Sequence, residues 1–228
     1  MLGGPRDVCL IDVYETLLTV DFSSVLAELA AMARVPPGDF RAALGETEAS
    51  VTIGEVTMAD ALRRALRSCG IEPDGSLVRD LVDADRRQPS ETVRLHDDAN
   101  AFLEMLKRRG VRSALVSSCA ENTRPLLAHL GLDVRVDAVV LSCEAGCAKP
   151  SPRMYYRALA ELGADPRRAV LVDDQATYCE GAAALGIAAA RIVRDSGDAR
   201  PAQPGTTVVR SLLDVEPLFS SRSSAVQP

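Results

Sequence analysis

Residues that could do chemistry follow four short apolar runs of the sequence. They are, in chain order, Asp12, the pair Ser117 and Ser118, Lys149, and the pair Asp173 and Asp174. Each run has the length and composition of a buried strand, and the carboxyl ends of parallel strands meet at one edge of their sheet. We therefore expect a carboxylate, hydroxyl groups, an ammonium group and an acidic pair to converge on one rim, as in a functional site.

The residue types indicate how this rim would work. Asp12 is the candidate nucleophile, because a carboxylate can form a covalent intermediate with an electrophilic centre. Lys149 would balance the charge of that carboxylate and of an anionic substrate. The hydroxyl groups of Ser117 and Thr16 would donate hydrogen bonds to substrate oxygens or to Asp12, with Ser118 beside them as a substrate-binding residue.

Oxygen ligands on the same rim predict a metal site. The carboxylates of Asp12 and Asp174 and the backbone carbonyl of Tyr14 are hard ligands, which suit Mg²⁺ rather than zinc or copper. A zinc site is not expected, because the six cysteines are scattered without a CxxC pair and neither histidine lies at ligand spacing.

The elements that must position these residues alternate between strand and helix. Strands are expected at 8–11, 111–116, 138–141, 169–172, 187–192 and 207–209, and helices at 99–109, 121–130, 151–162 and 178–185. Strands separated by helices of this length need crossover connections. The pattern predicts a doubly wound parallel sheet with helices on both faces, which is a Rossmann-like α/β core.

Residues 19–93 interrupt the alternation and contain helical patterns only, at 22–34, 58–69 and 76–87. An all-helical block of this length, placed after the first strand, predicts an inserted cap domain. The expected domains are therefore an α/β core of residues 1–18 and 94–217, a helical cap of residues 19–93, and a mobile tail of residues 218–228.

The composition is that of a soluble globular protein, with 228 residues of which 47% are hydrophobic and 25% charged. The net charge of −6 argues against a nucleic-acid partner, which would need a basic face. No apolar stretch approaches the roughly 20 residues of a membrane span, and the first residues lack a secretory signal. We expect a cytoplasmic monomer or homodimer with a small anionic substrate and no membrane partner.

Four segments carry the residues of the rim. They are Asp12-Val13-Tyr14-Glu15-Thr16-Leu17-Leu18, Leu115-Val116-Ser117-Ser118, Ala148-Lys149-Pro150-Ser151-Pro152 and Val170-Leu171-Val172-Asp173-Asp174. In this order they resemble the four motifs of the haloacid dehalogenase (HAD) superfamily of aspartate-nucleophile hydrolases, and the helical insertion resembles the family's cap. The resemblance implies a Rossmann-like core, an inserted cap, and hydrolysis through Asp12.

One position resembles the dehalogenase branch of this family. Family phosphatases carry a second aspartate two residues after the nucleophile, which protonates the leaving alcohol and later activates water. Here Tyr14 occupies that position, and a phenol with a pKa of about 10 is a poor base at neutral pH. The pattern Asp-x-Tyr-x-Thr-Leu is similar to 2-haloacid dehalogenases, whose halide leaving group needs no proton. Tyr155 resembles a substrate-binding tyrosine of those enzymes, and a core aromatic explains it equally well.

The acidic pair Asp173 and Asp174 resembles the phosphatase branch instead. Dehalogenases of this type use no metal and have small polar residues at these positions. Two more carboxylates beside Asp12 would be electrostatically costly without a cation. The resemblance implies Mg²⁺, with Asp174 as a direct ligand and Asp173 beside it.

Three functions remain open at this point. The favoured one is a Mg²⁺-dependent phosphatase acting on a small phosphorylated metabolite, in which Tyr14, Glu15 or a water replaces the missing acid. The second is a metal-independent 2-haloacid dehalogenase, with Asp12 attacking a halogenated carbon. The third is a catalytically weak protein whose cap recognises a ligand or a partner.

Overall fold

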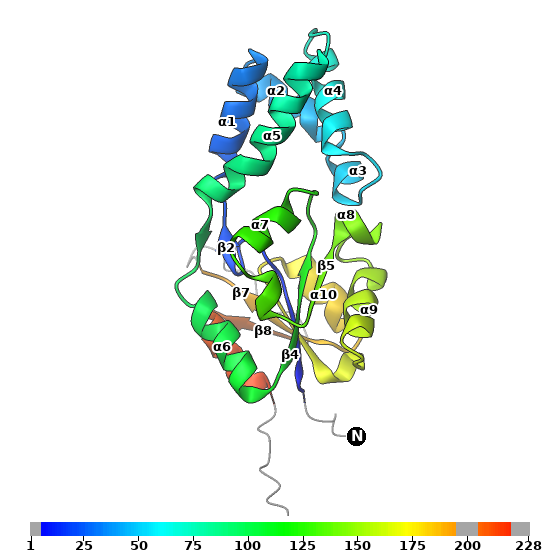
Figure 1. Ribbon diagram of the computed structural model, residues 1–228. Helices are drawn as coiled ribbons and strands as arrows, with labels where there is room; N and C mark the ends of the chain where they lie inside the picture. The colour runs from blue at the N-terminus through cyan, green and yellow to red at the C-terminus, as the bar shows by residue number, and fades with distance from the viewer. Residues whose placement is uncertain (1–5, 195–204, 220–228) are drawn as a thin grey trace, which may run out of the picture.

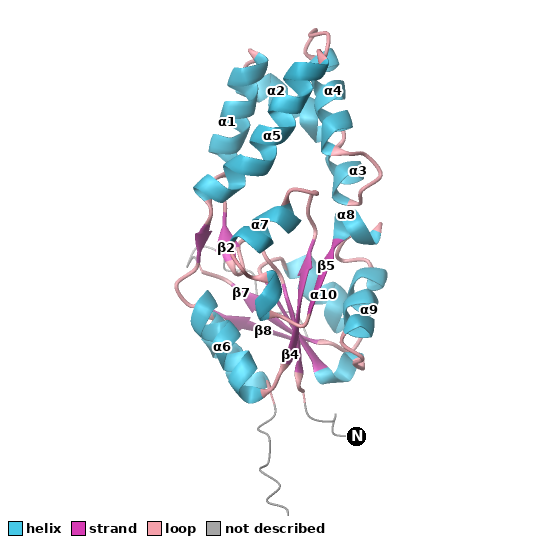
Figure 2. Ribbon diagram, viewed as in Figure 1, coloured by secondary structure: helices cyan, strands magenta, loops and turns pink. Residues whose placement is uncertain are grey.

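A parallel sheet lies at the centre of the computed structural model, which describes residues 6–194 and 205–219 (Figures 1 and 2). The strand order is β5-β4-β1-β6-β7-β8, and every neighbouring pair is parallel. The strands are β1 (Val8–Ile11), β4 (Arg112–Ser117), β5 (Ala138–Leu141), β6 (Ala169–Asp173), β7 (Ala188–Ile192) and β8 (Thr206–Val209). The predicted doubly wound α/β fold is confirmed.

Helices cover both faces of this sheet because its strands are apolar on both sides. In β1, Cys9 and Ile11 pack into the cluster that includes Phe102, whereas Val8 and Leu10 pack into the cluster that includes Met154. The helices after residue 95 are α6 (Ala99–Arg109), α7 (Thr123–His129), α8 (Ser142–Ala145), α9 (Pro152–Glu161) and α10 (Ala176–Ala183). Short 3₁₀ helices η1 (Asp133–Arg135) and η2 (Pro166–Arg168) complete the connections.

A second, helical layer lies over the carboxyl edge of the sheet (Figure 1). Its helices are α1 (Phe22–Ala33), α2 (Pro37–Gly45), α3 (Glu48–Thr52), α4 (Met58–Ser68) and α5 (Gly75–Thr92). Helix α5 packs on α1 and α4, and α2 packs on α1 and α4. We call this layer the cap. The chain enters and leaves it through two antiparallel two-residue strands, β2 (Leu18–Thr19) and β3 (Arg94–Leu95).

The expected helical pattern of the cap was incomplete. Helices α2 and α3 were not predicted, because the run Pro36-Pro37-Gly38 reads as a loop. Pro37 instead occupies the first turn of α2, where its missing N–H is no loss, and Phe40 is buried. Helix α5 also continues past the expected end at residue 87, through Pro89 to Thr92.

The C-terminal segment is anchored to the core by hydrogen bonds to Asp98. Asp98 accepts hydrogen bonds from Arg194 at 3.0 Å, from the Ser211 hydroxyl at 2.9 Å and from the Leu212 N–H at 2.8 Å. The tail was predicted to begin at residue 218, but Leu218 ends the 3₁₀ helix η3 (Leu212–Leu218) and Phe219 is buried. The rest of the predicted tail, residues 220–228, lies outside the described residues.

No helix in the described part of the chain has both the length and the apolar character needed to cross a bilayer.

Candidate active site

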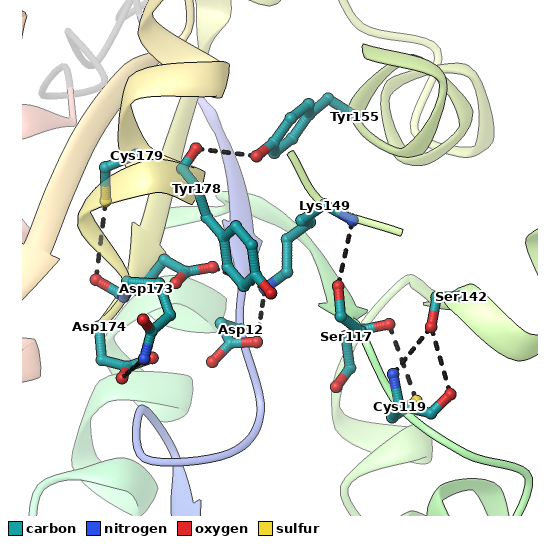
Figure 3. A network of polar contacts seen from close by, with 12 residues as sticks. Asp12, Ser117, Cys119, Ser142, Lys149, Tyr155, Asp173, Asp174, Tyr178 and Cys179 are labelled. Carbon is teal, nitrogen blue, oxygen red and sulfur yellow. Dashed lines mark hydrogen bonds and ion pairs between the residues drawn. The ribbon is translucent and has the colours of Figure 1, made fainter. Parts of the chain in front are cut away.

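The predicted rim forms at the carboxyl edge of the sheet (Figure 3). Asp12 follows β1 directly, and its backbone N–H donates to the carbonyl of Val172 at 2.9 Å. Because β1 lies between β4 and β6, the last residues of those strands, Ser117 and Asp173, flank it. All three side chains are buried.

Lys149 is the counter-ion of this rim. Its Nζ donates to Asp12 Oδ1 and to Asp173 Oδ2, in both cases at 2.6 Å, and lies 4.8 Å from the centre of the Tyr178 ring. Burial alone would lower the pKa of Lys149, but the two carboxylates together outweigh it and raise the pKa above its ordinary value. Lys149 is therefore a fixed positive charge shared by two carboxylates.

The loop that carries Lys149 is held from two sides. The backbone N–H of Lys149 donates to the Ser118 hydroxyl at 3.1 Å, which links the loop to the end of β4. On the other side α10 approaches closely, since a Cβ atom at Gly181 would lie 2.8 Å from Pro150 Cβ. Only glycine allows this contact.

The two aspartates after β6 differ in their partners. Both carboxylate oxygens of Asp173 are used, because Oδ1 accepts from the Gln175 N–H at 2.9 Å and Oδ2 binds Lys149. Asp174 forms no ion pair within the described residues, and its Oδ2 accepts from the side chain of Gln175 at 2.6 Å. Burial, followed by the charge of Asp12, raises the pKa of Asp173 to about 7 and that of Asp174 to about 6.

This arrangement fits a divalent cation. Ligand oxygens of Asp12, Asp173 and Asp174 all lie within 4.8 Å of one another. Lys149 pairs with two of these carboxylates, so three ionised carboxylates would face one positive charge, and Asp174 has no ion pair within the described residues. Clustered carboxylate oxygens are the ligands that Mg²⁺ prefers, and Asp12 and Asp174 are the predicted direct ligands.

Two hydroxyl groups on the rim are poised to donate. Among the described residues, Thr16 Oγ1 and Ser117 Oγ are buried without a hydrogen-bond partner. A buried hydroxyl normally finds a partner, because leaving it unsatisfied costs about 1–3 kcal/mol. Their unused hydrogens, with Ser117 at the end of the strand next to β1, fit the predicted role as donors to substrate oxygens.

A family model described as haloacid dehalogenase-like hydrolase matches residues 6–186. This chain belongs to that family. The match contains every segment of the rim and the whole cap, as the sequence motifs predicted.

The sequence relatives of this HAD-like hydrolase include phosphatases, and the solved structures that share its fold include dehalogenases and phosphatases. A phosphoserine phosphatase of Thermus thermophilus is 34% identical over 113 residues, which are 49% of this chain and 44% of that protein, so the chain spans less than half of that relative. Two solved structures show the same fold. An L-2-haloacid dehalogenase of Xanthobacter autotrophicus has a TM-score of 0.66 at 22% identity and covers 93% of this chain and 97% of its own. A HAD phosphatase of Thermococcus onnurineus has a TM-score of 0.67 at 20% identity, with coverage of 94% and 98%.

Tyr14 occupies the position at which the family's phosphatases carry the second aspartate, and its hydroxyl already has a hydrogen-bond partner. The Tyr14 hydroxyl lies 2.9 Å from Thr123 Oγ1, and the ring packs 5.4 Å from that of Phe22. Burial raises the pKa of Tyr14 above the ordinary phenol value. Glu15, the other predicted substitute, is exposed and accepts a hydrogen bond from Thr19 at 2.9 Å. Both side chains therefore already have a hydrogen-bond partner in the protein.

Tyr155 was predicted to bind substrate, and the structure contradicts this. The side chain is fully buried in the core, and its hydroxyl donates to the backbone carbonyl of Tyr178 at 2.8 Å (Figure 3). The tyrosine instead fixes α10, which places the Tyr178 ring beside Lys149.

The sequence did not point to three residues near the rim of this hydrolase. Tyr178 is one of them, and its ring lies beside Lys149. Asp85 of α5 and Asn122, which precedes α7, join the cap to the core, where Asn122 Nδ2 donates to Asp85 Oδ2 at 3.1 Å. Such a contact between distant segments leaves no spacing pattern that could have revealed it.

Proposed function

We propose that this HAD-like hydrolase is a Mg²⁺-dependent phosphatase acting on a small phosphorylated metabolite. The observation that carries the proposal is the third carboxylate on the rim. Lys149 is the counter-ion of Asp12 and Asp173. Asp174 is half-buried, has no ion pair within the described residues, and has a carboxylate oxygen within 4.8 Å of those of the other two. Displacement of a halide needs no such group, whereas transfer of a phosphoryl group benefits from added positive charge.

The residues of the rim can carry out the first half of the reaction. Lys149 binds Asp12 Oδ1, whose second lone pair would face the cation, so Oδ2 is the oxygen that attacks phosphorus. A bond forms between this oxygen and phosphorus, and the ester P–O bond breaks with its electron pair on the leaving oxygen. Ser117 and Thr16 donate hydrogen bonds to the non-bridging oxygens, whose charge Lys149 offsets.

Asp12, Asp174 and the backbone carbonyl of Tyr14 would hold the Mg²⁺, with Asp173 keeping Lys149 in position. When bound, the ion supplies positive charge against the phosphoryl oxygens. Water then attacks the phosphorus of the aspartyl phosphate and regenerates the Asp12 carboxylate.

The lack of a proton donor and acceptor slows both the departure of a basic alcohol in the first half and the attack of water in the second half. Because neither Tyr14 nor Glu15 is arranged as an acid or base, the leaving alkoxide and the attacking water must exchange protons with solvent. General acid–base help is typically worth about 10²–10⁴-fold, so esters of basic alcohols should react much more slowly than esters of acidic phenols.

A 2-haloacid dehalogenase is the second candidate, favoured by Tyr14. A halide leaves without a proton, so the engaged phenol would be no handicap. In that reaction Asp12 attacks carbon, the carbon–halogen bond breaks with its electron pair on the halide, and water hydrolyses the resulting ester.

Parallel assays separate the two candidates. Phosphate release from p-nitrophenyl phosphate and halide release from 2-chloropropionate are measured with Mg²⁺ and with a chelator, using Asp12→Asn as the inactive control. The proposal predicts phosphate release that requires Mg²⁺ and disappears in the variant. Halide release that is indifferent to the chelator, without phosphate release, would overturn it.

A further inference from the structure

A cavity of about 490 Å³ opens between the cap and the core. It shares Tyr14 and Ser118 with the rim, so a substrate bound at Asp12 would extend its leaving group into it. Its wall comes from the cap helices and from the segment 118–123 of the core, and most of the wall is apolar, including Phe22, Val25, Leu29 and Val51. The cavity therefore fits an apolar body.

One wall of this cavity contains a buried carboxylate. Asp85 is only 6% exposed, and its described hydrogen bond is the one from Asn122. No ion pair to Asp85 occurs within the described residues. Its neighbour Arg86 pairs with Glu121 instead, at 3.3 Å. Arg41 also lines the cavity, but it is exposed on α2.

Within the part of the chain that the structure describes, Asp85 therefore forms no ion pair, although Arg86 lies near enough to lower its pKa. A buried charge without a partner is costly, and here burial raises the pKa of Asp85 to about 6, while the hydrogen bond from Asn122 acts in the opposite direction. At neutral pH the group is still mostly ionised. A cation on a bound ligand would supply the missing partner.

Aromatic rings on the same cavity favour one type of cation. Tyr14 and Phe22 line the wall with their ring centres 5.4 Å apart, and Phe22 is 49% exposed. A carboxylate together with aromatic faces is an environment that attracts an ammonium group.

We propose that Asp85 recognises an ammonium group on the leaving part of the substrate, which would then be a phosphate monoester of an apolar alcohol or phenol bearing an amine. This proposal rests on the proposed phosphatase function. It makes Asp85 a specificity-determining residue of the cap.

Two matched esters test this directly. 4-(Aminomethyl)phenyl phosphate and 4-ethylphenyl phosphate have nearly the same shape and differ in an ammonium against a methyl group. The wild-type kcat/KM should favour the amine by about tenfold or more, because a buried polar group left unpaired penalises the analogue that cannot bind it. In Asp85→Asn, which keeps the shape but removes the charge, the two values should become nearly equal. Asp83→Asn is the matched control, since Asp83 is exposed on the same helix, and it should keep the preference.

Equal kcat/KM values in the wild type, or a preference that persists in Asp85→Asn, would overturn the proposal. The wild-type comparison stands even if that variant does not fold. A calorimetric measurement separates this proposal from the phosphatase function, because it needs no turnover. The wild type should bind 4-(aminomethyl)phenol more tightly than 4-ethylphenol, and Asp85→Asn should lose this difference in affinity. That result would support the role of Asp85 even if no phosphate ester is hydrolysed. Equal binding of the two phenols would refute it.

Discussion

Replacing Lys149 with methionine should destabilise the protein strongly, although the two side chains have similar length. The Lys149 and Asp173 side chains are both 0% exposed, and Nζ contacts Asp12 and Asp173 at 2.6 Å each. Removing one partner of a buried ion pair typically costs about 3–5 kcal/mol, since the other charge stays buried without compensation. For a chain of this length that corresponds to a fall in Tm of about 6–20 °C.

The loss in Lys149→Met should depend on pH. Without the ammonium group, the folded-state pKa of Asp173, which burial already raises to about 7, rises further above its unfolded value. A carboxyl group with a raised folded pKa favours folding below its unfolded pKa, and this contribution is lost as the pH rises through the folded pKa. The variant should therefore be closest to wild type near pH 4–5 and furthest from it at about pH 8.

Urea unfolding followed by circular dichroism at pH 5 and pH 8 measures both effects. The matched control is Lys107→Met, because Lys107 is exposed in the last turn of α6, and surface changes of this kind usually stay within about 0.5 kcal/mol. If Lys149→Met unfolded within about 1 kcal/mol of wild type at pH 8, the reasoning that Lys149 is the desolvated counter-ion of the rim would be refuted.

Three further changes test other parts of the site and fold. Tyr14→Asp should raise steady-state hydrolysis of phenyl phosphate by about 10²-fold, because it supplies the missing acid and base; an unchanged rate would contradict this. Asp174→Asn should raise the Mg²⁺ concentration for half-maximal activity by about tenfold or more, as one direct ligand is lost; an unchanged Mg²⁺ titration would argue against that ligand. Burial alone would raise the pKa of Asp98, but hydrogen bonds, first from Arg194, hold it below its usual range. Its stabilisation is therefore present at neutral pH and lost as the pH falls through the folded pKa, below about 4. Asp98→Asn should flatten the decline in urea stability between pH 7 and pH 3, and an identical decline would count against this network.

The sheet and the rim were predictable because their signals are local. Each strand is a short apolar run bounded by glycine, proline or a charge, and parallel topology brings the residues after the strands to one edge. The positions of Asp12, Ser117 and Asp173 follow from that rule alone. The ammonium group of Lys149 could be expected there because its loop follows the next strand in the chain.

The remaining errors arose where tertiary packing decides. Helix α2 begins at a proline pair that locally favours a loop, and the burial of Phe40 stabilises the helix instead. Tyr155 lies on the buried face of α9, and only the fold shows that its hydroxyl is used by the backbone of α10. The approach of Asp85 to Asn122 depends on how the cap sits on the core, which no residue spacing encodes.

The most direct test of the proposed mechanism is the first turnover of p-nitrophenyl phosphate, followed by rapid quench in the presence of Mg²⁺. Nitrophenolate is a good leaving group, so Asp12 should be phosphorylated quickly. The resulting aspartyl phosphate should be hydrolysed slowly. We expect a burst of nitrophenolate of about one equivalent per active site, and a phosphoryl group on the peptide that contains Asp12. Asp12→Asn should show neither. Turnover without a phosphoryl group on Asp12 at any time would contradict the assignment of Asp12 as the nucleophile.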